Sequence, residues 1–67
     1  MLPSVVQVRV SRADYNALVA KAKKIGTVIA RVRTCSQTKW NVFVQLDKDT
    51  SFDFAESFLG TVGTIVP

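Results

Sequence analysis

The sequence predicts a small α+β protein in which two helices cover one face of an antiparallel sheet, with elements in the order β-α-β-β-α-β. Two observations lead to this fold class. Several segments alternate apolar and polar side chains, as strands with one covered face do. Between them, two segments repeat apolar residues at helical spacing, and each begins near a serine or threonine and ends at a glycine.

Residues 4–10 form the first predicted strand and residues 12–25 the first predicted helix. In the strand, valines alternate with polar side chains, which indicates one covered and one open face. The helix starts with a Ser11 and Asp14 pair, in which the hydroxyl accepts a backbone N–H and the carboxylate complements the positive helix end. We expect the helix to end at Gly26, because glycine readily takes the positive φ that is common after a helix.

Two further strands and a second helix follow. The second strand covers residues 27–35, and the polar loop 36–39 joins it to a third strand over residues 40–46. A short second helix is predicted to begin after Thr50, whose hydroxyl suits a helix start, and to end at Gly60.

The C-terminal residues 61–66 favour a short edge strand, interrupted by Gly63. With this strand, the order of elements is that of the compact split βαβ, ferredoxin-like fold. The first and third strands then lie side by side in the middle of the sheet, and the second strand flanks the third. The alternative is a βαββα arrangement with an irregular C-terminal segment. In both cases residues 1–67 form a single domain, because 67 residues leave no room for a second.

Composition narrows the class of function. Residues 1–40 hold eight basic side chains against one acidic, whereas residues 41–67 hold one basic against four acidic, and the net charge is +4. This asymmetry favours an anionic partner for the basic part and also suits head-to-tail contacts between copies. With one cysteine, no histidine and no glycine-rich phosphate loop, we expect no metal, no other cofactor and no enzymatic activity.

Size and hydropathy predict the cellular location and the oligomeric state of the protein. No segment has the length and apolar content of a membrane span, and the N-terminal residues lack the pattern of a secretory signal. We therefore expect a cytoplasmic protein with no membrane partner. A domain this small builds a limited core and has no disulfide to support it, so we expect a homo-oligomer, most simply a dimer. A tightly packed monomer is the alternative.

The second predicted strand indicates a basic surface on the face opposite the helices. Under regular alternation the helices cover Val28, Ala30 and Val32, while Arg31 and Arg33 point outward. Together with the outward residues of the neighbouring strands, the predicted binding face consists of Gln7, Arg9, Arg31, Arg33, Lys39, Asn41 and Phe43.

Trp40 is expected on the covered face, where its large ring closes the core at the open end of the sheet. The alternative is that this ring is a surface on which a ligand binds. A slip of one residue in the hairpin register would place it on the basic face.

Nucleic acid is the partner that this predicted face favours, because guanidinium groups pair with phosphates and an aromatic ring stacks on a base. The topology and its open face are similar to those of RNA recognition motifs, although Phe43 is the single aromatic residue on that face and the glycine-aromatic signature is missing. One alternative is a protein-binding module for an acidic surface, such as a phage or mobile-element inhibitor or assembly factor. Another is a homodimeric small-ligand sensor. A dimer interface on the same face is equally compatible with arginine and aromatic residues.

Overall fold

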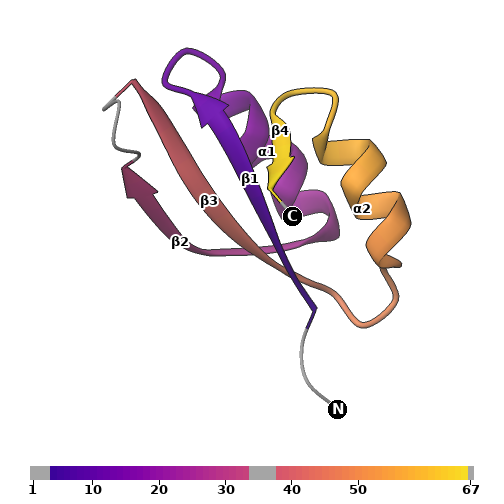
Figure 1. Ribbon diagram of the computed structural model, residues 1–67. Coiled ribbons are helices and arrows are strands. Elements are labelled where there is room, and N and C mark those ends of the chain that lie inside the picture. Colours follow the sequence, from indigo (N-terminus) through magenta and orange to yellow (C-terminus); the bar gives the residue numbers. More distant parts are fainter. Residues whose placement is uncertain (1–3, 34–37, 67) are drawn as a thin grey trace.

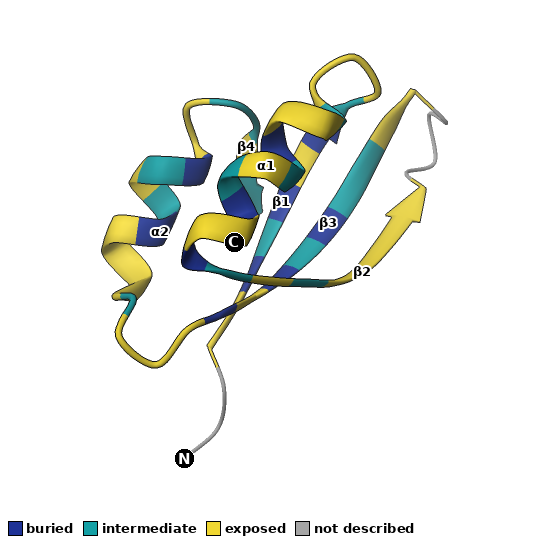
Figure 2. Cartoon of the chain, turned by 180° about the vertical axis from the view of Figure 1, so that it is seen from behind, coloured by how far each residue is buried: buried dark blue, intermediate teal, exposed yellow. Residues whose placement is uncertain are grey.

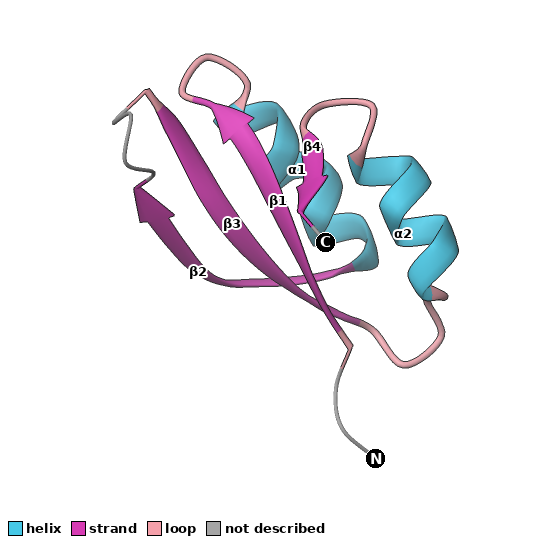
Figure 3. Ribbon diagram, viewed as in Figure 1, coloured by secondary structure: helices cyan, strands magenta, loops and turns pink. Residues whose placement is uncertain are grey.

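The computed structural model of the chain describes residues 4–33 and 38–66. Its elements, in chain order, are β1 (Val5–Ser11), α1 (Tyr15–Ile25), β2 (Gly26–Arg33), β3 (Lys39–Leu46), α2 (Phe52–Leu59) and β4 (Thr64–Val66). The four strands form one antiparallel sheet in the order β2-β3-β1-β4, and both helices lie on the same face of it (Figure 1, Figure 3). The predicted α+β, ferredoxin-like arrangement is therefore confirmed, with β1 and β3 in the centre of the sheet.

The hydrophobic core lies between the two central strands and the two helices. Alternation along β1 and β3 places valines opposite one another, with Val6 paired to Val44 and Val8 to Val42. The helices cover these valines with Leu18 and further apolar side chains. The buried residues are Val6, Val8, Val10, Leu18, Ala22, Ile25, Val42, Val44, Leu46, Ala55 and Leu59.

The first helix starts three residues later than the sequence predicts. β1 continues to Ser11, because Ser11 still pairs with Lys39 of β3. The Ser11 hydroxyl accepts the backbone N–H of Asp14 at 3.2 Å and donates to its carboxylate at 3.0 Å. This reciprocal pair holds residues 12–14 in a turn, and α1 begins at Tyr15.

Gly26 connects α1 to β2 without a linker. Its φ of 173° is extended, so the expectation of a left-handed conformation at this helix end is wrong. Glycine is required for another reason, since a Cβ at this position would overlap the backbone carbonyl oxygen of Gln45 on β3. The end of α1 thus lies directly against the sheet.

The second helix is capped by Ser51 and not by Thr50. The Ser51 hydroxyl accepts the backbone N–H of Phe54 at 3.1 Å, and Asp53 lies in the first turn, where its charge complements the positive helix end. At the other end, the N–H of Gly60 donates to the carbonyl of Glu56 at 2.9 Å.

Replacement of Ser51 by alanine is expected to lower the free energy of unfolding by about 1 kcal/mol, because a backbone N–H at the start of α2 loses its acceptor. Urea titration followed by circular dichroism measures this change. Thr50→Ala is the matched control and is expected to leave stability nearly unchanged. Equal losses for the two variants would contradict a cap at Ser51.

The last strand is shorter than predicted. Residues 61–63 form a turn in which the N–H groups of Val62 and Gly63 both donate to the carbonyl of Leu59 at 3.1 Å, so that β4 is limited to Thr64–Val66. β4 is an edge strand, as predicted, and pairs with the middle of β1. Within the described ranges, none of the helices is long and apolar enough to cross a membrane.

Candidate nucleic-acid interface

β2 contains a β-bulge that decides which face its side chains occupy. Val28 pairs with Val44 of β3, but the next pair is Ala30 with Phe43, so Ile29 is an extra residue without a partner on β3. Because side chains alternate along a strand, one extra residue moves every later side chain to the opposite face. β2 is an edge strand, where bulges are common.

The predicted placement of the β2 side chains is wrong beyond the bulge. Arg31 pairs with the buried Val42 and Arg33 with Trp40, so both arginines lie on the face that carries the helices. Ala30 and Val32 lie on the open face, and both are exposed. Of the three residues expected under the helices, only Val28 packs against the core. Residues 34–37, which include the end of the predicted strand and half of the predicted loop, lie outside the described residues.

The two arginines stack on aromatic rings. The Cζ of Arg31 lies 4.7 Å from the centroid of the Trp40 ring and 5.1 Å from that of Tyr15. The Cζ of Arg33 lies 5.1 Å from the Trp40 centroid, and the two aromatic rings are 6.3 Å apart. These four residues, from α1, β2 and β3, form what we call the arginine–aromatic cluster.

The cluster is accessible although it lies on the helix side of the sheet. α1 begins at Tyr15, and the β2–β3 hairpin extends beyond the helices, so residues 30–33 are exposed on both faces (Figure 2). Tyr15 and Trp40 are half-buried. Trp40 packs against the core, as predicted, and its ring also supports the two guanidinium groups.

The cluster carries positive charge that no carboxylate of the described residues neutralises by an ion pair. Among the side chains that the structure describes, no aspartate or glutamate forms an ion pair with Arg31 or Arg33. Stacking on a ring uses the face of a guanidinium group and leaves its N–H donors at the edge available. The cluster therefore presents two sets of charge-assisted donors beside an aromatic surface, which is the chemistry that phosphates and bases require.

The open face contains the other five residues of the predicted site. Gln7 pairs with Phe43, Arg9 with Asn41 and Ser11 with Lys39, so these side chains share the face opposite the helices. The Nε of Arg9 donates to Asn41 Oδ1 at 3.4 Å. Without Arg31 and Arg33, the basic residues of the predicted set on this face are Arg9 and Lys39, and the face is less basic than the sequence predicts.

Tyr15 belongs to the cluster and was not expected as a site residue. Its helical spacing indicates a core position, which agrees with its half-buried ring but does not predict the contact with Arg31. The one signal for the cluster is the pair Val28 and Ile29, two adjacent apolar residues that interrupt strict alternation and permit a bulge.

No protein-family model, curated protein or solved structure matches this chain. In the described part of the chain, no group of three or more cysteine, aspartate or glutamate side chains is arranged to hold a metal ion. The geometry of the cluster and the charges around it are therefore the basis for a functional assignment.

Proposed function

We propose that this protein binds single-stranded nucleic acid, with the arginine–aromatic cluster as its anchor. The observation that carries the proposal is the stacking of Arg31 and Arg33 on the one indole ring of the chain, with no carboxylate partner in the described residues. Each guanidinium edge supplies donors for a phosphate, while the aromatic rings supply a surface for an unpaired base. The protein acts in this proposal as a non-enzymatic binder in the cytoplasm.

A single strand suits the cluster better than a duplex. Trp40 and Tyr15 are half-buried between the hairpin and the start of α1, so a base must leave its stack to reach them. Unpaired bases stack on protein aromatic rings with little dependence on sequence. Lys39 and Arg9 lie on the opposite face of the sheet and offer further charge to the backbone of a strand that passes around the edge formed by β2.

Replacing both Arg31 and Arg33 by alanine is expected to weaken binding of a single-stranded oligonucleotide more than tenfold at low salt, because two charge-assisted contacts are lost. The slope of log affinity against log salt should fall by about 1.4, since each phosphate contact on a single strand contributes about 0.7. Anisotropy of a labelled oligonucleotide measures both quantities. Trp40 is the single tryptophan in the chain, so quenching of tryptophan fluorescence reports independently on contact with the cluster.

Lys23→Ala/Lys24→Ala is the matched control. It removes the same charge from the far end of α1, where both lysines are exposed and outside the cluster. We expect this variant to keep most of the affinity and of the salt slope. A wild-type protein that does not bind at low salt, or equal losses for the two double variants, would refute the proposed site.

A further inference from the structure

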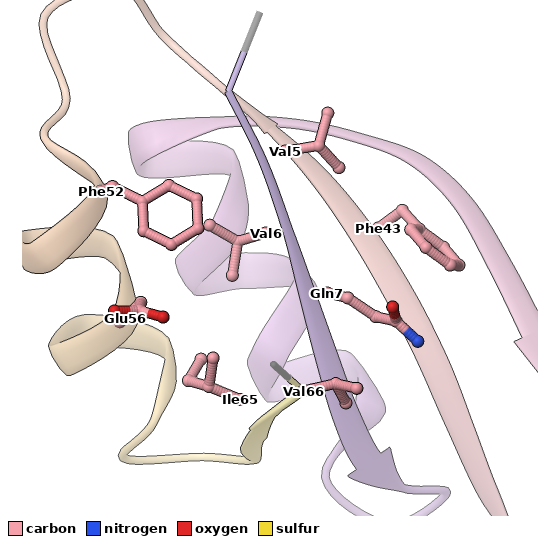
Figure 4. A pocket seen from close by; sticks show the side chains of 8 residues that line it. All are labelled: Val5, Val6, Gln7, Phe43, Phe52, Glu56, Ile65 and Val66. Carbon is pink, nitrogen blue, oxygen red and sulfur yellow. The ribbon is translucent and has the colours of Figure 1, made fainter.

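A pocket lies near the edge of the sheet opposite to the arginine–aromatic cluster, where β4 ends beside β1 and α2 begins (Figure 4). Its volume is about 360 Å³. The pocket reaches around this edge of the sheet. On the helix side it is lined by Val6, Ile65, Phe52 and Glu56, which adds one carboxylate, and on the open face by Val5, Gln7, Phe43 and Val66. Figure 4 shows the Phe52 ring and the Glu56 side chain both directed from α2 toward β1.

The side chains that line this pocket are suited to bind a guanidinium group. Phe52 is 45% exposed, which leaves much of its ring free for a planar cation. Glu56 is half-buried, and within the described ranges no side chain donates to its carboxylate. The methylene stem of an arginine can pack on the apolar walls while its head pairs with Glu56.

The surroundings of the pocket add negative charge. Asp53 lies in the first turn of α2, and the turn that precedes it carries Asp47 and Asp49 against the single basic side chain of Lys48. We call the pocket with these neighbours the acidic pocket surface. A cationic partner with apolar or aromatic groups is complementary to it.

We infer that the occupant of the pocket is an arginine from the β2–β3 hairpin of a second copy of this chain. The chain carries both halves of a complementary pair, the acidic pocket surface at the β4 edge and the exposed Arg31 and Arg33 at the β2 edge. Because these halves lie at opposite edges of one sheet, they meet only between copies. A contact of this kind is head-to-tail, so copies that are joined by it extend into open chains or close into rings.

This self-association does not require nucleic-acid binding, but it uses the same two arginines. A phosphate backbone and the acidic pocket surface therefore compete for the cluster. A single helix face and one hairpin bury less area than a permanent interface does, which makes the contact weak and easily exchanged. A single-stranded oligonucleotide is expected to separate associated copies.

Two variants with complementary defects test this arrangement by sedimentation velocity at low salt. Glu56→Lys removes the acceptor but keeps the arginines, whereas Arg31→Glu/Arg33→Glu removes the arginines but keeps the pocket. The wild type should associate beyond two copies as its concentration rises. Each variant alone should associate at least tenfold more weakly, because like charges then face one another. A mixture of the two variants keeps one intact contact and reverses both charges at the other, so it should associate more strongly than either variant alone.

Several results would overturn the inference. A wild type that sediments as one chain at every concentration excludes self-association, and a Glu56→Lys variant that associates like the wild type excludes the pocket. Circular dichroism establishes that each variant is folded. Phe52→Leu is the second test of the pocket: it keeps the charge but removes the aromatic ring, and it should weaken self-association. Glu56→Lys should bind the oligonucleotide at least as tightly as the wild type does, because its arginines no longer have a competing partner, so the failure of one proposal is distinguishable from the failure of the other.

Discussion

Replacing Leu18 by alanine is expected to remove most of the stability of this protein. Leu18 is fully buried at the centre of α1, between the helix and the central strands. Truncation of a buried leucine costs about 2–5 kcal/mol, because apolar contacts are lost and the cavity is only partly refilled. Domains are stable by about 0.05–0.15 kcal/mol per residue, which is roughly 3–10 kcal/mol for a chain of this length. The loss is therefore comparable with the whole free energy of unfolding.

Urea titration of the Leu18→Ala variant, followed by circular dichroism, measures the effect. Val19→Ala is the control, since Val19 neighbours Leu18 on α1 but is only half-buried. We expect this second variant to shift the urea midpoint much less. Similar shifts for the two variants would mean that α1 does not pack on the sheet through the face that carries Leu18 and Ala22.

The central part of the fold follows from the sequence because local and long-range requirements agree there. β1 and β3 are each covered on one face by the helices, and each pairs on both sides. A shift of one residue in either strand would expose a row of valines, so the alternation of apolar residues determines the register. The sequence predicts the first residue of each helix less well, because several neighbouring polar residues are able to cap the helix N-terminus. Ser51 competes with Thr50 at α2, and the pairing of Ser11 with Lys39 delays α1.

The alternation of apolar residues does not determine on which face of the sheet Arg31 and Arg33 lie. β2 pairs only with β3, and the helices leave residues 30–33 uncovered, so burial does not decide between the two registers there. The regular register would place Val32 beside Trp40, and the bulged register places Arg31 and Arg33 there instead. Contacts between guanidinium groups and the rings of Trp40 and Tyr15 accompany the bulged register. Such contacts join three elements and leave no periodic signal in the sequence.

The consequence is that alternation placed the predicted site residues of the two central strands on the correct face and those of the edge strand on the wrong one. Gln7, Arg9, Lys39, Asn41 and Phe43 share the open face, as predicted, while Arg31 and Arg33 lie on the other face with Trp40. The chain therefore offers an aromatic ring on each face of one hairpin, Phe43 on the open side and Trp40 on the helix side. These two rings allow the two possible binding faces to be compared by experiment.

Replacing Trp40 by leucine is expected to weaken oligonucleotide binding about 5- to 150-fold, because the stacking of a base on an aromatic ring contributes about 1–3 kcal/mol. Leucine keeps apolar contact with the core, and both arginines keep their charge. The slope of log affinity against log salt should therefore remain that of the wild type, in contrast to the loss of slope expected for Arg31→Ala/Arg33→Ala. Anisotropy of a labelled oligonucleotide is the suitable measurement, since the variant has no tryptophan.

Phe43→Leu makes the same kind of replacement on the opposite face and is the decisive control. If the strand binds at the arginine–aromatic cluster, Phe43→Leu should keep nearly the affinity of the wild type, because its ring lies on the other side of the sheet. If Phe43→Leu weakens binding and Trp40→Leu does not, the open face is the binding face, as regular alternation predicts. In that case the two arginines contribute charge from the far side of the hairpin, and their stacking on Trp40 serves to shield the end of the core.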